Sequence, residues 1–128
     1  MKAYTDLEQS KVLSKILPPE SVDMCYEVGV DLDGYLTKTI YTPLIHAPYN
    51  DYYIPCWSLS ALINIIPQEI FDGEYIINIT EGINNRWILT YDHYENRNHS
   101  YYGLSTGADN LIDCCVEMII KLKERDLL

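Results

Sequence analysis

The stretch Tyr75-Ile-Ile-Asn-Ile-Thr-Glu-Gly-Ile-Asn-Asn-Arg-Trp-Ile-Leu-Thr-Tyr-Asp92 decides the fold class of this 128-residue chain. Residues 75–80 and 86–92 both alternate in the way that is typical of half-buried strands. Gly82 and Asn85 bound the short connection between them, so we predict an antiparallel hairpin. One face should carry Tyr75, Ile77 and Ile79 beside Trp87, Leu89 and Tyr91.

Three helices are predicted around this hairpin. The last follows an N-cap at Asn110, with Asp113 at the N3 position and an apolar stripe of Ile112, Cys115, Ile119 and Leu122. The middle helix follows Ser58, ends at Pro67, and carries Leu59, Leu62, Ile63 and Ile66 at helical spacing. The first helix opens with a Thr5-x-x-Glu8 capping box and ends at Pro18-Pro19. Its apolar residues on one face are Leu7, Val12, Ile16 and Leu17.

Further strands complete the predicted architecture. Residues 24–42 indicate a second hairpin with a loop at 29–34, 43–51 a loop, and 52–54 and 100–104 short strands. Strands joined by turns favour an α+β fold, with one antiparallel sheet of about 5–6 strands and three helices mainly packed on one face. The chain length predicts a single domain over 1–128. Its core should contain Leu59, Leu62, Ile63, Trp87, Leu89, Cys115, Ile119 and Leu122.

The charge of the chain is −10 and is concentrated in its middle. Residues 16–85 contain ten acids and Lys38 as their single base. Such a chain is repelled by phosphate backbones and anionic lipids, so direct binding to nucleic acid or membrane is disfavoured. Two interpretations stay open: surface acids that provide solubility, or an acidic mimic of nucleic acid that blocks a DNA- or RNA-binding protein. Because many acids flank turns, we expect them to be dispersed.

Cysteine usage and hydropathy indicate a reducing, cytoplasmic setting. No apolar run approaches the ~18 residues of a membrane span, and the polar start does not resemble a signal peptide. Cys25, Cys56, Cys114 and Cys115 are expected to be buried thiols, since no pair has zinc-site spacing. The Asp31-x-Asp33-Gly34 segment departs from a calcium loop and favours a turn. We therefore expect no metal and no cofactor.

Four segments together resemble a group of small uncharacterised proteins of gut anaerobic bacteria and of their phages and mobile elements. They are Asp6-Leu-Glu-Gln-Ser-Lys, Ile16-Leu-Pro-Pro-Glu-Ser-Val-Asp-Met24, Tyr53-Ile-Pro-Cys-Trp-Ser-Leu-Ser-Ala-Leu62 and Asp113-Cys-Cys-Val-Glu-Met-Ile-Ile-Lys-Leu122. The resemblance implies an intracellular setting and a phage or mobile-element origin. It implies no activity, cofactor or catalytic residue.

Tyrosine is the unusual component, with twelve Tyr against one Phe. Tyrosines mixed with Asn, Ser and Gly are typical of adaptable recognition surfaces, although half-buried strands also favour tyrosine. The predicted binding surface comprises Tyr49, Tyr52, Tyr53, His93, Tyr94, Arg97, His99, Tyr101 and Tyr102. The first hypothesis is thus a non-enzymatic protein–protein interaction module whose partner is another protein.

A small enzyme is the remaining hypothesis, and it has two versions. Cys56 precedes a predicted helix, whose N-terminus lowers the pKa of a thiol, and His46 lies ten residues before it as a candidate base. The His93/His99 loop, with Asp92 and Glu95, offers acid–base groups instead. Burial of Cys56 as a packed core thiol, and solvation of the loop, are the structural alternatives.

Overall fold

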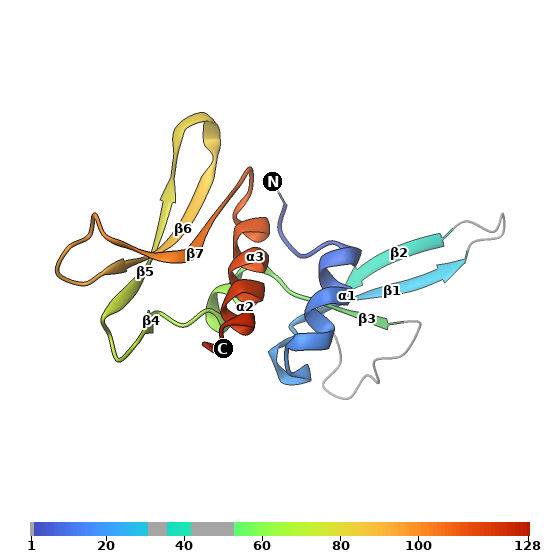
Figure 1. Cartoon of the computed structure of the whole chain (residues 1–128). Coiled ribbons are helices and arrows are strands. Elements are labelled where there is room, and N and C mark those ends of the chain that lie inside the picture. Colours follow the sequence, from blue (N-terminus) through green and yellow to red (C-terminus); the bar gives the residue numbers. More distant parts are fainter. Residues whose placement is uncertain (1, 31–35, 42–52) are drawn as a thin grey trace.

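Two antiparallel sheets lie on either side of a central helix in the computed structural model, which describes residues 2–30, 36–41 and 53–128 (Figure 1). The smaller sheet has the order β2-β1-β3 and the larger sheet the order β4-β5-β6-β7. Their strands are β1 (Met24–Val30), β2 (Leu36–Tyr41), β3 (Tyr53–Cys56), β4 (Glu69–Ile70), β5 (Tyr75–Glu81), β6 (Trp87–His93) and β7 (Ser100–Ala108). The helices are α1 (Leu7–Ile16), α2 (Leu59–Ile65) and α3 (Leu111–Glu124), with short 3₁₀ turns at Pro19–Ser21 and Ile83–Asn85.

The α+β class and the three helices are confirmed, but the prediction of one sheet of 5–6 strands is wrong. The reason is the position of α3, which packs against β6 and β7 of the larger sheet, against α2, and against α1, the helix that contacts β3 of the smaller sheet (Figure 1). Seven of its side chains are buried: Ile112, Cys114, Cys115, Val116, Met118, Ile119 and Leu122. A helix buried over so much of its surface needs cover on more than one side, so the helices do not share one face of one sheet.

The predicted β5–β6 hairpin is confirmed in register as well as in extent. Ile77 lies opposite Tyr91 and Ile79 lies opposite Leu89, so the expected apolar face is continuous across both strands. β7 continues the sheet beyond β6 and is longer than the short strand expected at 100–104. Its pattern is harder to identify because Gly103 and Gly107 interrupt it.

The predicted caps of α2 and α3 are confirmed, whereas that of α1 is wrong. The side chain of Ser58 accepts the amide hydrogen of Ala61, and that of Asn110 accepts the amide hydrogen of Asp113. The capping box of α1 is formed by Asp6 and Gln9. Thr5 cannot cap the helix because its hydroxyl accepts the amide hydrogen of Trp57, 3.1 Å away.

The apolar faces of α1 and α2 are rotated from those expected. On α1 the buried residues are Ser10 and Leu13, while Val12 is 45% exposed. On α2, Ala61 and Leu62 are buried and Ile63 is 40% exposed. A helix with apolar residues on several sides can turn different ones toward its neighbours, and tertiary packing makes that choice.

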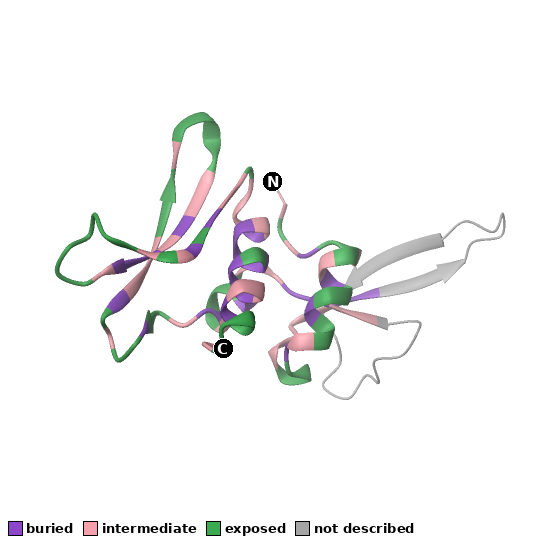
Figure 2. Cartoon of the chain, viewed as in Figure 1, coloured by how far each residue is buried: buried purple, intermediate pink, exposed green. Residues whose placement is uncertain are grey.

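One core joins the helices to the four-stranded sheet, and buried residues concentrate along α3 (Figure 2). Leu62, Leu89, Cys115, Ile119 and Leu122 are buried in it as predicted. Leu59 and Trp87 are half-buried at the margin of this core. The prediction that Ile63 belongs to the core is wrong, because Ile63 is 40% exposed. The predicted core did not include Leu13, Trp57 and Leu104, and it omitted Tyr91, Ile112 and Met118 although they lie on the predicted apolar faces of the hairpin and the last helix.

Basic side chains bind the backbone of β7, which is the edge strand of the larger sheet. Lys121 donates to the carbonyl oxygen of Ser105 over 3.0 Å, and Arg86 donates to that of Gly107 over 3.1 Å. Arg125 donates to the carbonyl oxygen of Tyr102 over 3.4 Å. These carbonyls are therefore paired with side chains instead of with another strand.

Candidate functional site

Six aromatic rings meet at one end of the four-stranded sheet, where the β4–β5 and β6–β7 connections lie (Figure 1). We call them the ring cluster: Phe71, Tyr75, His93, Tyr94, His99 and Tyr101. Tyr75 is buried at its centre, with its ring centroid 5.1 Å from Tyr101 and 5.5 Å from His93. The amide of Tyr94 donates to the carbonyl of Glu74 over 3.0 Å and holds the two connections together. Ring pairs at these separations attract one another beyond the effect of area burial alone.

Phe71 is the most unusual member of the ring cluster. It is the single phenylalanine of the chain, its side chain is 43% exposed, and its centroid lies 5.0 Å from that of Tyr101. Its φ is 53°, and Asp72 and Gly73 follow with φ of 55° and 86°. A bulky residue in the left-handed region costs of order 1–3 kcal/mol, and such strain concentrates at functional sites. The strained turn presents an aromatic side chain to solvent.

His93 organises the β6–β7 connection. Its Nδ1 accepts the amide hydrogens of Glu95 and Asn96, at 3.2 and 3.4 Å, and its ring stacks on Tyr94 at an interplanar angle of 28°. Its Nε2 lies 3.9 Å from a carboxylate oxygen of Glu74. Both ring nitrogens thus face groups of the protein, and the arrangement fixes the ring of Tyr94, which is 51% exposed.

A carboxylate also borders the exposed side of the ring cluster. The hydroxyl of Tyr94 donates to Glu95 over 2.9 Å, and this hydrogen bond to the carboxylate raises the pKa of Tyr94. Glu74 contributes a second carboxylate beside His93. Exposed rings with carboxylates at their border attract cationic side chains through both ring faces and charge.

The cluster contains four of the predicted binding residues: His93, Tyr94, His99 and Tyr101. Arg97 is exposed, and Tyr102 is 93% exposed outside the ring contacts. Tyr53 begins β3 of the smaller sheet, so it lies in a different sheet from the 93–102 segment. Tyr49, Tyr52 and His46 lie outside the described residues.

Phe71 and Tyr75 were not predicted as site residues. Tyr75 was recognised only as a residue of the hairpin face. The signal that marks Phe71 is weak: a lone phenylalanine followed by an Asp-Gly turn, four positions before Tyr75.

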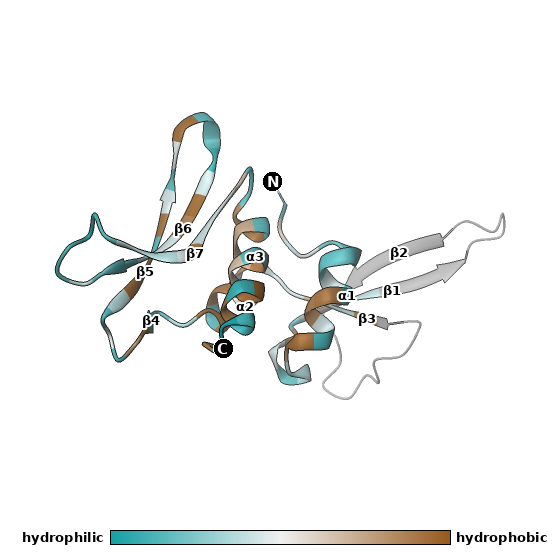
Figure 3. Ribbon diagram, viewed as in Figure 1, coloured by the Kyte–Doolittle hydropathy of each residue, from teal (hydrophilic) through white to brown (hydrophobic). Residues whose placement is uncertain are grey.

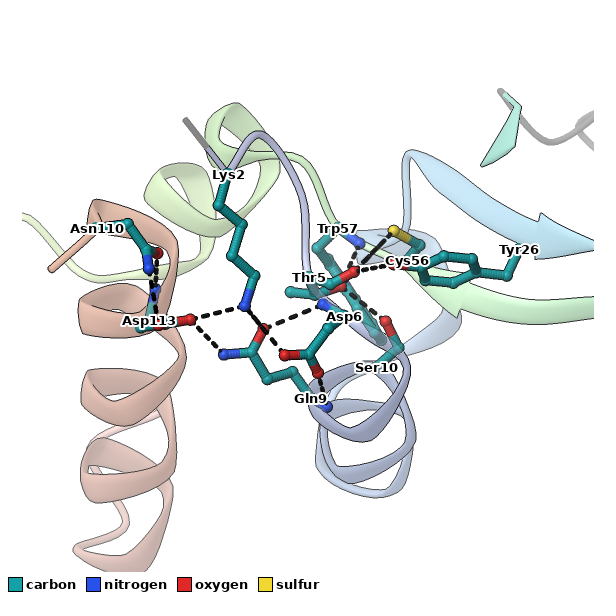
Figure 4. Close-up of polar contacts among 10 residues, drawn as sticks. All are labelled: Lys2, Thr5, Asp6, Gln9, Ser10, Tyr26, Cys56, Trp57, Asn110 and Asp113. Atoms are coloured by element: carbon teal, nitrogen blue, oxygen red, sulfur yellow. Dashed lines mark hydrogen bonds and ion pairs between the residues drawn. The ribbon is translucent and has the colours of Figure 1, made fainter. Parts of the chain in front are cut away.

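Cys56 lies in a buried polar cluster that we call the Thr5 hub: Thr5, Ser10, Tyr26, Cys56 and Trp57 (Figure 4). The hydroxyl of Thr5 bonds that of Ser10 over 2.8 Å, and its carbonyl oxygen accepts from Tyr26 over 2.6 Å. The thiol of Cys56 is fully buried and donates to the same carbonyl over 3.5 Å. Burial raises the pKa of Cys56, which is the opposite of an activated nucleophile.

A second polar group joins the N-terminal segment to α3 (Figure 4). The ammonium of Lys2 lies 3.0 Å from Asp6 and 2.8 Å from Asp113, and the amide nitrogen of Gln9 donates to Asp113 over 2.7 Å. All four side chains satisfy one another, so this group connects α1 with the start of α3. It stabilises the fold and presents no unpaired reactive atom.

An apolar groove of about 330 Å³ lies between α2 and the four-stranded sheet. It is lined by Ile63, Asn64, Ile66, Gln68, Ile76, Ile77, Ile79 and Leu89. Apolar residues also occur at the exposed tip of the β5–β6 hairpin, where Ile83 is 87% exposed, but hydrophilic residues separate them from the groove (Figure 3). None of the lining side chains is an acid, a base or a nucleophile, so the groove itself supplies no chemistry.

The acids of residues 16–85 with described side chains are spread over the fold. Glu20 lies in the 3₁₀ turn after α1, and Asp23 bonds Ser58. Glu69, Asp72 and Glu74 lie at one end of β5, and Glu81 ends the strand at the other. Asp31, Asp33 and Asp51 lie outside the described residues, as does the side chain of Glu27.

The four cysteines are buried, and Cys56, Cys114 and Cys115 are free thiols. Within 2–30, 36–41 and 53–128, no three His, Cys, Asp or Glu side chains gather in a way that could hold a metal ion. No helix in these ranges has the length and apolar character needed to cross a bilayer. No family model, curated protein or solved structure matches this chain, so its ring cluster is interpreted from its own geometry.

Proposed function

We propose that the chain is a non-enzymatic protein–protein interaction module that binds its partner through the ring cluster. The observation that supports this function is Phe71, an exposed aromatic side chain on a strained left-handed backbone. Packing alone favours burying such a side chain, whereas recognition favours presenting it on a rigid turn. Tyr94 provides a second exposed ring that is already oriented by its stacking on His93.

Rigidity is the physical advantage of this arrangement. A ring held by neighbours loses little conformational entropy on binding, so more of its contact energy contributes to affinity. The turn 71–73, the stacked pair His93–Tyr94 and the buried Tyr75 together hold the surface before any partner arrives. The groove beside α2 has no aromatic side chain in its lining.

The test is quantitative affinity capture from a lysate of the host cells, read by mass spectrometry. The wild-type chain is compared with the double variant Phe71→Asn/Tyr94→Ser and with the control Ile83→Ser. The control removes an apolar side chain that is more exposed than Phe71, 87% against 43%, from the opposite end of the β5–β6 hairpin. Proteins captured by wild type and control but lost from the double variant support the proposal. Equal capture by all three chains contradicts it.

The enzyme hypothesis is tested separately, by the reactivity of Cys56 in the purified chain. A buried thiol with a raised pKa should react with a thiol reagent only as the chain unfolds. Rapid modification of Cys56 alone in the folded chain would support a nucleophile and contradict a purely structural Thr5 hub.

The mimic hypothesis is tested by adding the chain to host DNA-binding proteins at two salt concentrations and measuring DNA release. Salt-sensitive release that is abolished by neutralising Asp31, Asp33, Glu69 and Asp72 together would favour a mimic.

A further inference from the structure

A guanidinium group already occupies a site beside the ring cluster. The guanidinium carbon of Arg125 lies 5.9 Å from the ring centroid of Tyr101, which is within the range of a cation–π contact. Its Nη1 donates to the carbonyl oxygen of Tyr102 over 3.4 Å. A ring face and a carbonyl oxygen together match a planar cation that stacks and donates at its edge.

Gly103 provides the space for this group. A Cβ on Gly103 would lie 1.9 Å from Nη2 of Arg125 and 2.8 Å from its guanidinium carbon, so no other residue fits beneath the guanidinium in this position. The φ of Gly103 is 83°, which also favours glycine. We call Tyr101, the Tyr102 carbonyl and Gly103 the guanidinium seat.

Arg125 is held weakly in this seat. Its contact to Tyr101 is near the outer limit for a cation–π pair, and its hydrogen bond of 3.4 Å is long. No carboxylate of the described residues forms an ion pair with it. Its side chain is exposed at the end of α3. An exposed contact of this kind is weak enough for a competing group to replace it.

The charge around the ring cluster favours a cationic competitor. The segments 69–75 and 94–97 contain four acids, Glu69, Asp72, Glu74 and Glu95, and a single base, Arg97. Two of these carboxylates contact members of the ring cluster, since Glu74 lies beside His93 and Glu95 accepts from Tyr94. They would attract a basic segment and remain close to it once it is bound.

We propose that the guanidinium seat binds an arginine side chain of the partner polypeptide in place of Arg125, with the neighbouring rings covering the arginine's flanking residues. This inference rests on the proposed function and names the chemistry of the partner. Arginine is favoured over lysine because a planar guanidinium stacks on a ring while its edge donates to the carbonyl, and a compact ammonium does not.

The test uses the full chain and three synthetic peptides, acetyl-Gly-Arg-Gly-amide and its lysine and citrulline analogues, titrated by amide NMR. Arg125→Ala vacates the seat and should bind the arginine peptide about two- to fivefold more tightly than wild type, because a weak internal competitor is removed. The shifts should saturate and centre on residues 101–103. Lys123→Ala is the matched control: it removes an exposed base of α3 that forms no ion pair with a described residue, without opening the seat.

Two further variants keep the proposal falsifiable. Gly103→Ala in the Arg125→Ala background should abolish peptide binding by filling the seat. If that variant does not fold, Tyr101→Leu replaces it, since leucine keeps apolar bulk and removes the ring face. The proposal is overturned if Arg125→Ala shows no saturable shifts, if the citrulline peptide binds equally well, or if Lys123→Ala produces the same gain.

The outcomes also separate this inference from the proposed function. If partner capture depends on Phe71 and Tyr94 but no arginine peptide binds, the guanidinium seat is contradicted and the interaction module is still supported. If the arginine peptide binds but partner capture does not depend on Phe71 and Tyr94, the guanidinium seat is supported and the ring cluster is contradicted as the partner surface.

Discussion

The Thr5 hub and the ring cluster both gather polar or aromatic side chains, but they differ in burial, in hydrogen bonding and in backbone strain. In the hub, every hydroxyl has a partner, Trp57 and Cys56 are fully buried, and the thiol pKa is raised. In the ring cluster, Phe71 and Tyr94 are about half exposed, and the backbone of 71–73 is in the left-handed region. A satisfied, buried group stabilises a fold, whereas an exposed, strained one is retained against stability. Cys56 therefore belongs to the structural region of the molecule, although a thiol is chemically reactive.

The largest effect on stability is expected when a buried side chain of the Thr5 hub is truncated. Trp57→Ala should lower the free energy of unfolding by about 3–5 kcal/mol, because a fully buried indole leaves a large cavity. Urea denaturation measures the change. The control Tyr102→Ala alters a side chain that is 93% exposed and should change stability by less than about 0.5 kcal/mol. Equal effects of the two variants would mean that the hub is not part of the core.

A subtler change addresses the hydrogen bonds of the hub alone. Thr5→Val keeps the shape but removes the acceptor of the Trp57 amide and the partner of Ser10, so it should cost about 1–3 kcal/mol. Thr5→Ser retains the hydroxyl and should cost about 1 kcal/mol, the loss of one buried methyl group. Denaturation of both variants gives the comparison. A serine variant less stable than the valine variant would assign the role of Thr5 to packing.

The ring cluster should respond in the opposite way to substitution. Phe71→Asn places a residue that tolerates positive φ at a strained position, and it also removes ring contacts. The two effects oppose each other, so the free energy of unfolding should change by no more than about 1 kcal/mol. Thermal unfolding by circular dichroism is the measurement. A loss above about 3 kcal/mol would identify Phe71 as a structural residue and weaken the proposed binding surface.

The smallest expected effect concerns pH and the Lys2 group beside the hub. Burial opposes ionisation of Asp113, but hydrogen bonds from Lys2 and Gln9 outweigh burial and lower its pKa below the ordinary 3.8. Its contribution to stability is therefore complete above pH 3.8 and is lost as the pH falls through the lower pKa of the folded state. Both side chains are partly exposed, so the contribution is at most about 1 kcal/mol.

Lys2→Gln tests this sign. Between pH 6 and pH 3, wild type should lose more stability than the variant when unfolding by urea is measured at both values. Lys11→Gln is the control, since Lys11 is exposed and forms no ion pair with a described residue. Identical pH dependence of wild type and Lys2→Gln would show that the ion pair contributes nothing measurable.

Local signals account for the parts of the fold that the sequence predicts. The β5–β6 hairpin and the caps Ser58 and Asn110 depend on residues a few positions apart, and all three are confirmed. Thr5 was misassigned because its hydroxyl bonds a residue 52 positions away. The separation into two sheets likewise depends on where α3 packs, which no local pattern contains.

The candidate site follows the same rule. His93, Tyr94, His99 and Tyr101 were predicted together because they share one polar, aromatic loop. Phe71 and Tyr75 reach the same place from another connection through tertiary contacts, and the seat of Arg125 depends on where α3 ends against Gly103. Composition can therefore indicate an aromatic surface, but its assembly and its guanidinium seat require the folded chain.

The basic side chains on β7 have a consequence for self-association. An open edge strand is a template on which another copy can add a strand, and growth by repeated addition leads to fibrils. Three of the nine Lys and Arg residues, Arg86, Lys121 and Arg125, occupy carbonyls of this edge. An approaching strand must displace them before it can pair. In a chain with a net charge of −10, the acids keep copies apart at long range and these few cations protect the edge at contact.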